Sequence, residues 1–123
     1  MFKRQLMKSS VLAFGLALGV AAHAQTWPVK PVRIIVPFGP GGGTDIQGRL
    51  LGKKFFESMG QTFIVDNRAG AGGLIGAELA IKSPPDGYTI LFTTASLSVS
   101  LTLYGSLVKF DAFKDLAPIS WIS

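Results

Sequence analysis

Three consecutive glycines, Gly41, Gly42 and Gly43, stand directly before Thr44 and Asp45 in this 123-residue chain. Glycine lets a backbone adopt positive φ and approach a ligand closely. A helix beginning at Thr44 would leave the N–H groups of Gly43, Thr44 and Asp45 without partners inside the helix. Because such N–H groups attract carboxylates and phosphates, the stretch predicts an anion-binding site.

Other polar residues near this stretch have a structural explanation beside the functional one. The hydroxyls of Thr94 and Ser96 can donate to a carboxylate, and both are equally ordinary at the end of a strand. Asn67 and Arg68 could contact a ligand, but bracing a loop is the simpler interpretation. Asp45 suits the dipole of a first helical turn but would repel an anion. We therefore expect it to fix the loop or to meet a substrate ammonium.

Two glycine patterns match nucleotide-binding motifs only incompletely. Residues 43–48 have Walker-A spacing, but residues 49–50 are Arg-Leu where Lys-Ser/Thr is required. The glycines of 70–76 are closer to a dinucleotide fingerprint between a strand and a helix. Their last glycine is one residue late, and Phe92 stands near the place of the acid that would hold a ribose. A nucleotide-dependent enzyme domain using this loop is kept as an alternative.

The N-terminus has the order of features of a secretory signal. A basic opening with Lys3, Arg4 and Lys8 precedes an apolar run of 12 residues, 11–22, and an A-x-A motif ends at Ala24. This order is typical of a cleaved signal peptide, and the run is too short to cross a bilayer as a helix. We expect a signal peptide over 1–24, a periplasmic mature chain over 25–123, and no membrane-embedded segment after cleavage.

Composition narrows the chemistry of the mature chain. Loss of the signal would lower the net charge from +5 to +2 and remove the only histidine, His23, from a chain without cysteine. This excludes Ser-His-Asp and Cys-His nucleophile systems and the usual zinc sites. No basic cluster interleaved with aromatic residues indicates nucleic-acid binding. We expect a binding protein without catalytic residues, metal or cofactor.

From residue 25 onward the pattern is β-α-β-α-β, which is typical of a parallel α/β sheet. The predicted strands are 32–36, 62–65 and 88–93, and the predicted helices are 44–59 and 74–82. In such a sheet the loops that follow the strands meet at the carboxyl edge, where ligands bind. The loops 38–45, 67–73 and 93–96 should therefore converge.

The first predicted helix carries signals for its start, its packing and its end. Thr44 and Gln47 match a capping box, and Gly60 is well placed to end the helix. Gly48 and Gly52 would let it lie close to a neighbour, at some loss of helix propensity. The apolar side chains recur on one ridge formed by Leu51, Phe55 and Met59.

The pattern is weaker beyond Ala95. It suggests a short helix over 97–107, a helical turn over 113–116, and the opening of a fourth strand over 117–122. Since the chain stops inside that predicted strand, we expect a fragment of a longer protein.

Several motifs follow one another across the mature chain in a particular order and spacing. They are Trp27 to Phe38, Pro40-Gly41-Gly42 with Asp45 and Arg49, Asp66-Asn67-Arg68 with 70–73, Ile75-Gly76-Ala77, and Pro85 to Thr89. Together they resemble one known family, the Bug-type solute receptors of tripartite tricarboxylate transporters.

The resemblance implies an extracytoplasmic receptor with two α/β lobes of the type II-like periplasmic class that close over one small organic acid. It implies that membrane permease components receive the ligand, and that 25–123 form the N-terminal part of lobe one. The ligand-binding residues it implies are Phe38, Gly39, Gly42, Gly43, Thr44 and Asp45, with Ala95 and Ser96 opposite. A truncated fragment without a working site is the alternative.

The chain also departs from the family pattern. Gly39 stands where proline or a small residue is common, and Gly43 where serine is frequent. Residues 97–101, Leu-Ser-Val-Ser-Leu, replace a stretch that usually carries His and an Asn-Pro pair. The replaced stretch 97–101 concerns the wall of the site on which the identity of the ligand depends.

Overall fold

A parallel sheet forms the centre of the molecule in the computed structural model, which describes residues 26–122. Its strands are β1 (Val32–Val36), β2 (Phe63–Asn67) and β3 (Thr89–Leu91), in the order β2-β1-β3. Both neighbours run parallel to β1. The predicted α/β class is confirmed, while the predicted signal peptide over 1–24 lies outside the described residues.

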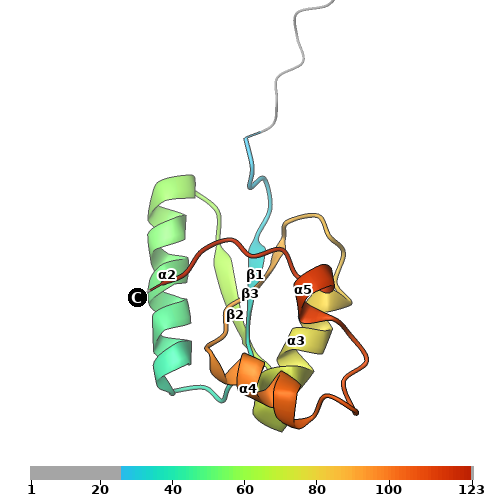
Figure 1. The fold of residues 1–123 in the computed structure, drawn as a ribbon. Coiled ribbons are helices and arrows are strands. Elements are labelled where there is room, and N and C mark those ends of the chain that lie inside the picture. The colour runs from blue at the N-terminus through green and yellow to red at the C-terminus, as the bar shows by residue number, and fades with distance from the viewer. Residues whose placement is uncertain (1–25, 123) are drawn as a thin grey trace, which may run out of the picture.

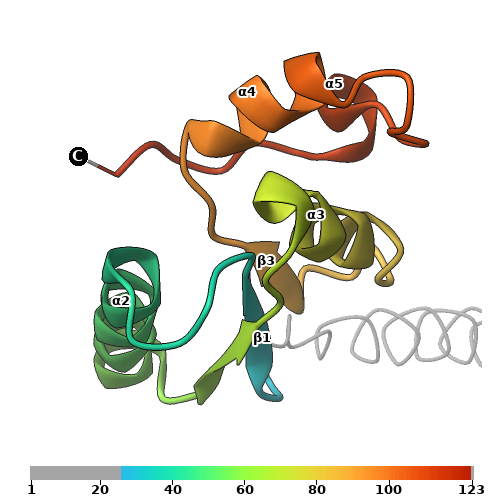
Figure 2. The same ribbon diagram turned by 90° about the horizontal axis from the view of Figure 1, so that it is seen from below.

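Helices cover both faces of this sheet (Figures 1 and 2). Helix α2 (Gly43–Met59) lies on one face, and α3 (Leu74–Ile81), preceded by the 3₁₀ turn η1 (Ala71–Gly73), lies on the other. Helix α4 (Ser96–Leu103) packs outside α3 against η1, and the short α5 (Ala112–Asp115) follows. No helix among residues 26–122 is long and apolar enough to span a membrane.

The central strand is buried from both sides. Val32, Ile34, Ile35 and Val36 are at most 1% exposed, as expected for a continuous apolar run covered by helices on both faces. One core cluster joins this strand to Phe63 under α2. A second joins Leu74 and Ala77 of α3 to Leu97 of α4.

The start of α2 differs from the prediction. The helix begins at Gly43, Gly42 is its N-cap, and no side chain caps it, so the predicted capping box of Thr44 and Gln47 is wrong. A capping side chain must stand outside the first turn, and Thr44 is already within it. The predicted end is confirmed, because Gly60 has φ 73° and its N–H donates to the Phe56 carbonyl at 2.9 Å.

The segment after β3 also differs from the prediction. Helix α4 ends at Leu103, before the predicted 107, and the predicted helical turn appears as α5. The predicted strand over 117–122 is wrong, because these residues form no regular structure. A strand needs a ladder partner, and the sheet of the described residues contains β2, β1 and β3 only.

Candidate functional site

The N-terminus of α2 opens at the carboxyl edge of the sheet. Gly42 is extended, with φ −77° and ψ 168°, and the first helical bond runs from the Ile46 N–H to the Gly42 carbonyl at 3.0 Å. The N–H groups of Gly43, Thr44 and Asp45 come before this first helical donor and therefore have no acceptor within the helix. A Cβ built at Gly39, Gly41 or Gly43 would meet nothing within 4 Å. The N-terminus of α2 is therefore open to a ligand.

Asp45 holds the glycine loop from inside. Its side chain is buried, and its carboxylate accepts from the Gly41 N–H at 2.8 Å, the Arg49 Nε at 3.1 Å and the Asn67 Nδ2 at 3.0 Å. The Gly41 N–H, followed by Arg49, lowers the pKa of Asp45 to about 2. The loop-fixing role predicted for Asp45 is confirmed, since its oxygens face protein donors.

Asn67 ties the first glycine loop to the end of β2. Its Nδ2 donates to the Phe38 carbonyl at 3.1 Å as well as to Asp45, and its Oδ1 accepts from the Arg49 Nη2 at 3.2 Å. Next to it, the Arg68 N–H donates to the Val36 carbonyl at 2.8 Å. Asn67 and Arg68 thus brace the loops, as the simpler interpretation predicted.

The second glycine loop is shaped by packing. A Cβ at Gly70 would lie 2.4 Å from the Ile75 Cδ1, and a Cβ at Gly76 would lie 2.7 Å from the Pro37 Cβ. Gly72 and Gly73 have positive φ of 63° and 99°. Close contacts and left-handed backbone account for these glycines without a nucleotide.

A third segment, between β3 and α4, reaches the same edge of the sheet (Figure 1). The Thr94 and Ser96 hydroxyls lie 2.8 Å apart and bond to each other. Because one O–H group suffices for this bond, the other can donate to a ligand. Thr93 differs from them, because its Oγ1 is buried and has no hydrogen-bond partner among the described residues. Ala95 and Ser96 themselves are exposed.

The structure therefore brings the three predicted loops to one edge, although no hydrogen bond joins 38–45 directly to 95–96. Phe38 packs on the core beside β1, whereas Gly39, Gly42 and Gly43 are exposed. Sequence reasoning did not find the partners of Asp45, since the N–H of Gly41 and the side chain of Asn67 meet it only in the folded chain.

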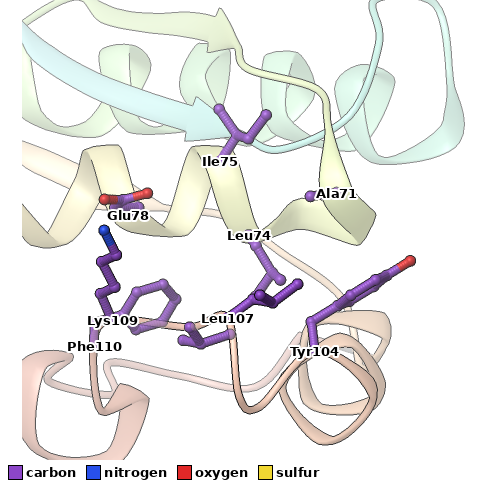
Figure 3. A pocket seen from close by; sticks show the side chains of 9 residues that line it. Ala71, Leu74, Ile75, Glu78, Tyr104, Leu107, Lys109 and Phe110 are labelled. Carbon is purple, nitrogen blue, oxygen red and sulfur yellow. The ribbon is translucent and has the colours of Figure 1, made fainter.

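A hollow of about 270 Å³ lies elsewhere, between α3 and the segment 104–110 (Figure 3). Its walls are mostly apolar and include Leu74, Leu107 and Phe110. Its carboxylate, Glu78, is already bonded to the Lys82 Nζ at 2.6 Å. Its other polar lining residues are Tyr104 and Lys109, and none of the predicted site residues lines it.

Comparison with known proteins agrees with the fold. A model of the family described as "Tripartite tricarboxylate transporter family receptor" matches residues 48–123. Protein BugT of Bordetella pertussis is 44% identical over 108 residues, which cover 85% of this chain and 33% of that protein. The chain spans about a third of the length of the curated relatives it matches.

Solved structures resemble the chain over about half its length. A protein of R. palustris with adipate is 45% identical with a TM-score of 0.52, covering 53% of this chain and 22% of that one. MatC from Rhodopseudomonas palustris with bound malate is 37% identical with a TM-score of 0.50, covering 53% and 22%.

These likenesses place the fold in the class of periplasmic binding proteins. Within that class, the chain belongs to the tripartite tricarboxylate transporter receptor family, which includes the Bug proteins.

Proposed function

We propose that this chain is the carboxylate-binding part of an extracytoplasmic receptor that captures a small organic acid for a tripartite tricarboxylate-type transporter. The observation that carries the proposal is the uncapped N-terminus of α2 at the carboxyl edge of the sheet, where three backbone N–H groups precede the first helical donor, Ile46. Adipate and malate in two related structures support the ligand class.

The proposed capture is non-covalent. The N–H groups of Gly43, Thr44 and Asp45 donate to one carboxylate oxygen pair, helped by the dipole of the 17-residue helix. The ionised Asp45 carboxylate bonds to Gly41 and Asn67, and its ion pair with Arg49 at 3.0 Å offsets the repulsion of an anion. Phe38, Gly39 and Gly42 shape the loop, and Ala95 and Ser96 form the facing wall. No catalytic residue, metal or cofactor takes part.

Nuclear magnetic resonance suits this proposal, because it reports on each backbone N–H and detects weak binding. The purified, ¹⁵N-labelled chain is titrated with adipate, with adipamide as a neutral control of the same length. We expect saturable amide shifts at Gly43, Thr44, Asp45 and Ser96 with adipate and none with adipamide. If neither adipate nor adipamide shifts these amides, the proposal is contradicted and a fragment without a working site is favoured.

The same spectra test the nucleotide alternative. Titration with NAD should leave the amides of 70–76 unchanged, because packing against Ile75 and Pro37 accounts for two of the glycines there. Saturable NAD shifts confined to that loop would favour a nucleotide-dependent enzyme domain instead.

Export to the periplasm and delivery to membrane permease components are further parts of the proposal. The basic, apolar and A-x-A segments of 1–24 support export. The protein recovered from the periplasm should begin at Gln25 on N-terminal sequencing. An intact Met1 in that fraction would contradict cleavage after Ala24.

A further inference from the structure

Two buried polar or charged residues, Asp45 and Ser100, are found among residues 26–122. Each bonds to the backbone of a different glycine loop at the same edge of the sheet. Asp45 accepts from the Gly41 N–H, and the Ser100 Oγ donates to the Gly72 carbonyl at 2.9 Å. Asp45 braces the first loop, and Ser100 makes the corresponding bond to the second.

Ser100 and Gly72 fit one another closely. Gly72 has φ 63°, and a Cβ built there would lie 2.1 Å from the Ser100 Oγ. A side chain at 72 would therefore occupy the place of the hydroxyl. The Ser100 hydroxyl therefore fits at this place because residue 72 has no side chain.

This hydrogen bond fixes the orientation in which α4 packs against η1. Leu97 and Leu101 attach α4 to Leu74 and Ala77 by apolar contacts, which are non-directional. Among the other hydroxyls of α4, Thr102 bonds within the helix to Ser98, and Ser96 bonds to Thr94 just before it. Ser100 alone among these reaches across to another element, η1.

We propose that Ser100 is a positioning residue for the carboxylate site. Its bond to Gly72 sets where the first turn of α4, with Ala95 and Ser96, lies relative to the loops that follow β1 and β2. Ser100 stands one helical turn after Ser96 in the same helix. A change in the position of Ser100 would therefore also move Ala95 and Ser96. This inference rests on the proposed function.

The test compares the Ser100→Ala chain with the natural chain in the adipate titration. The matched control is Ser98→Ala, which removes an exposed hydroxyl from the same helix. We expect Ser100→Ala to raise the dissociation constant for adipate about fivefold and to reduce the maximal shift of the Ser96 amide, while Gly43 and Thr44 keep their maximal shifts. Ser98→Ala should respond as the natural chain does, and Ser100→Thr, which keeps the hydroxyl, should restore the Ser96 response.

The possible failures are distinguishable. If Ser96 and Gly43 respond in Ser100→Ala as they do in the natural chain, the positioning role is overturned and the proposed function stands. If the natural chain shows no adipate shifts at all, both fall. Should Ser100→Ala fail to fold, Ser100→Cys gives the same comparison, because it has a similar size and a weaker donor.

Discussion

Gly43 is the first helical residue of α2, a position where proline is well accepted. The preceding Gly42 is extended, as the residue before a proline prefers. Gly43→Pro should therefore keep the helix and delete one N–H donor from the mouth. We expect adipate affinity to fall about tenfold, as measured by amide-shift titration.

Gly43→Ala is the matched control for that variant, because it adds a side chain where nothing lies within 4 Å and keeps the N–H. It should lose less affinity than Gly43→Pro. Equal losses in the two variants would show that the added atoms, and not the missing donor, weaken binding.

Asp45 should make the stability of the chain depend on acidity. Its pKa is about 2 in the folded chain, against an ordinary value of 3.8. The stabilisation by its ionised form is thus complete above about pH 4 and is lost as the pH falls through about 2. Asp45→Asn should lower the melting temperature at pH 6, and its difference from the natural chain should shrink toward pH 2.

The natural chain must be compared with Asp45→Asn because other carboxylates with lowered pKa values also affect stability at acidic pH. The pKa of Asp66 is lowered, since hydrogen bonds from Arg33 and Arg68 outweigh the rise caused by desolvation. The pKa of Glu78 is lowered mainly by Lys82. A melting-temperature difference that stays constant from pH 6 to pH 2 would contradict the role of the Asp45 charge.

At the scale of elements, close packing through glycine holds the helices to the sheet. Gly48 and Gly52 are buried in α2, where a Cβ would lie 3.1 Å from the Val36 Cγ2 and 3.2 Å from the Phe63 carbonyl oxygen. This confirms the predicted close approach. The predicted apolar ridge is less buried, since Met59 is 42% exposed.

On the other face, α3 approaches β1 through Gly76. A Cβ at 76 would lie 2.7 Å from the Pro37 Cβ and 2.9 Å from its Cα. Gly76→Ala should therefore destabilise the chain by about 1–3 kcal/mol, although alanine favours a helix by about 1 kcal/mol. Urea unfolding measures the difference. Gly39→Ala, with open space around it, is the control, and equal stability of the two variants would contradict the packing argument.

At the scale of the whole molecule, large apolar side chains lie uncovered after α4. Phe113 is 96% exposed, Trp121 82% and Ile119 79%. Exposed apolar patches and unpaired sheet edges promote association, and both outer strands of the three-stranded sheet have one free edge among the described residues. We expect the purified chain to associate as its concentration rises.

The double variant Phe113→Lys, Trp121→Lys should shift the sedimentation coefficient toward that of a single chain. The control is Gln47→Lys with Thr102→Lys, which adds the same charge at exposed polar positions. If both double variants behave alike, added charge and not the loss of apolar surface reduces the association.

The features that the sequence by itself determined are local ones. A continuous apolar run indicated β1, and the glycines before Thr44 indicated the mouth of α2, because unpaired N–H groups and positive φ depend on neighbouring residues. The tertiary structure decided what depends on distant residues. Asp45 bonds to Asn67, Ser100 bonds to Gly72, and 117–122 lacks the neighbour that would make it a strand. Such contacts form only when the chain folds, since they join segments that no local pattern relates.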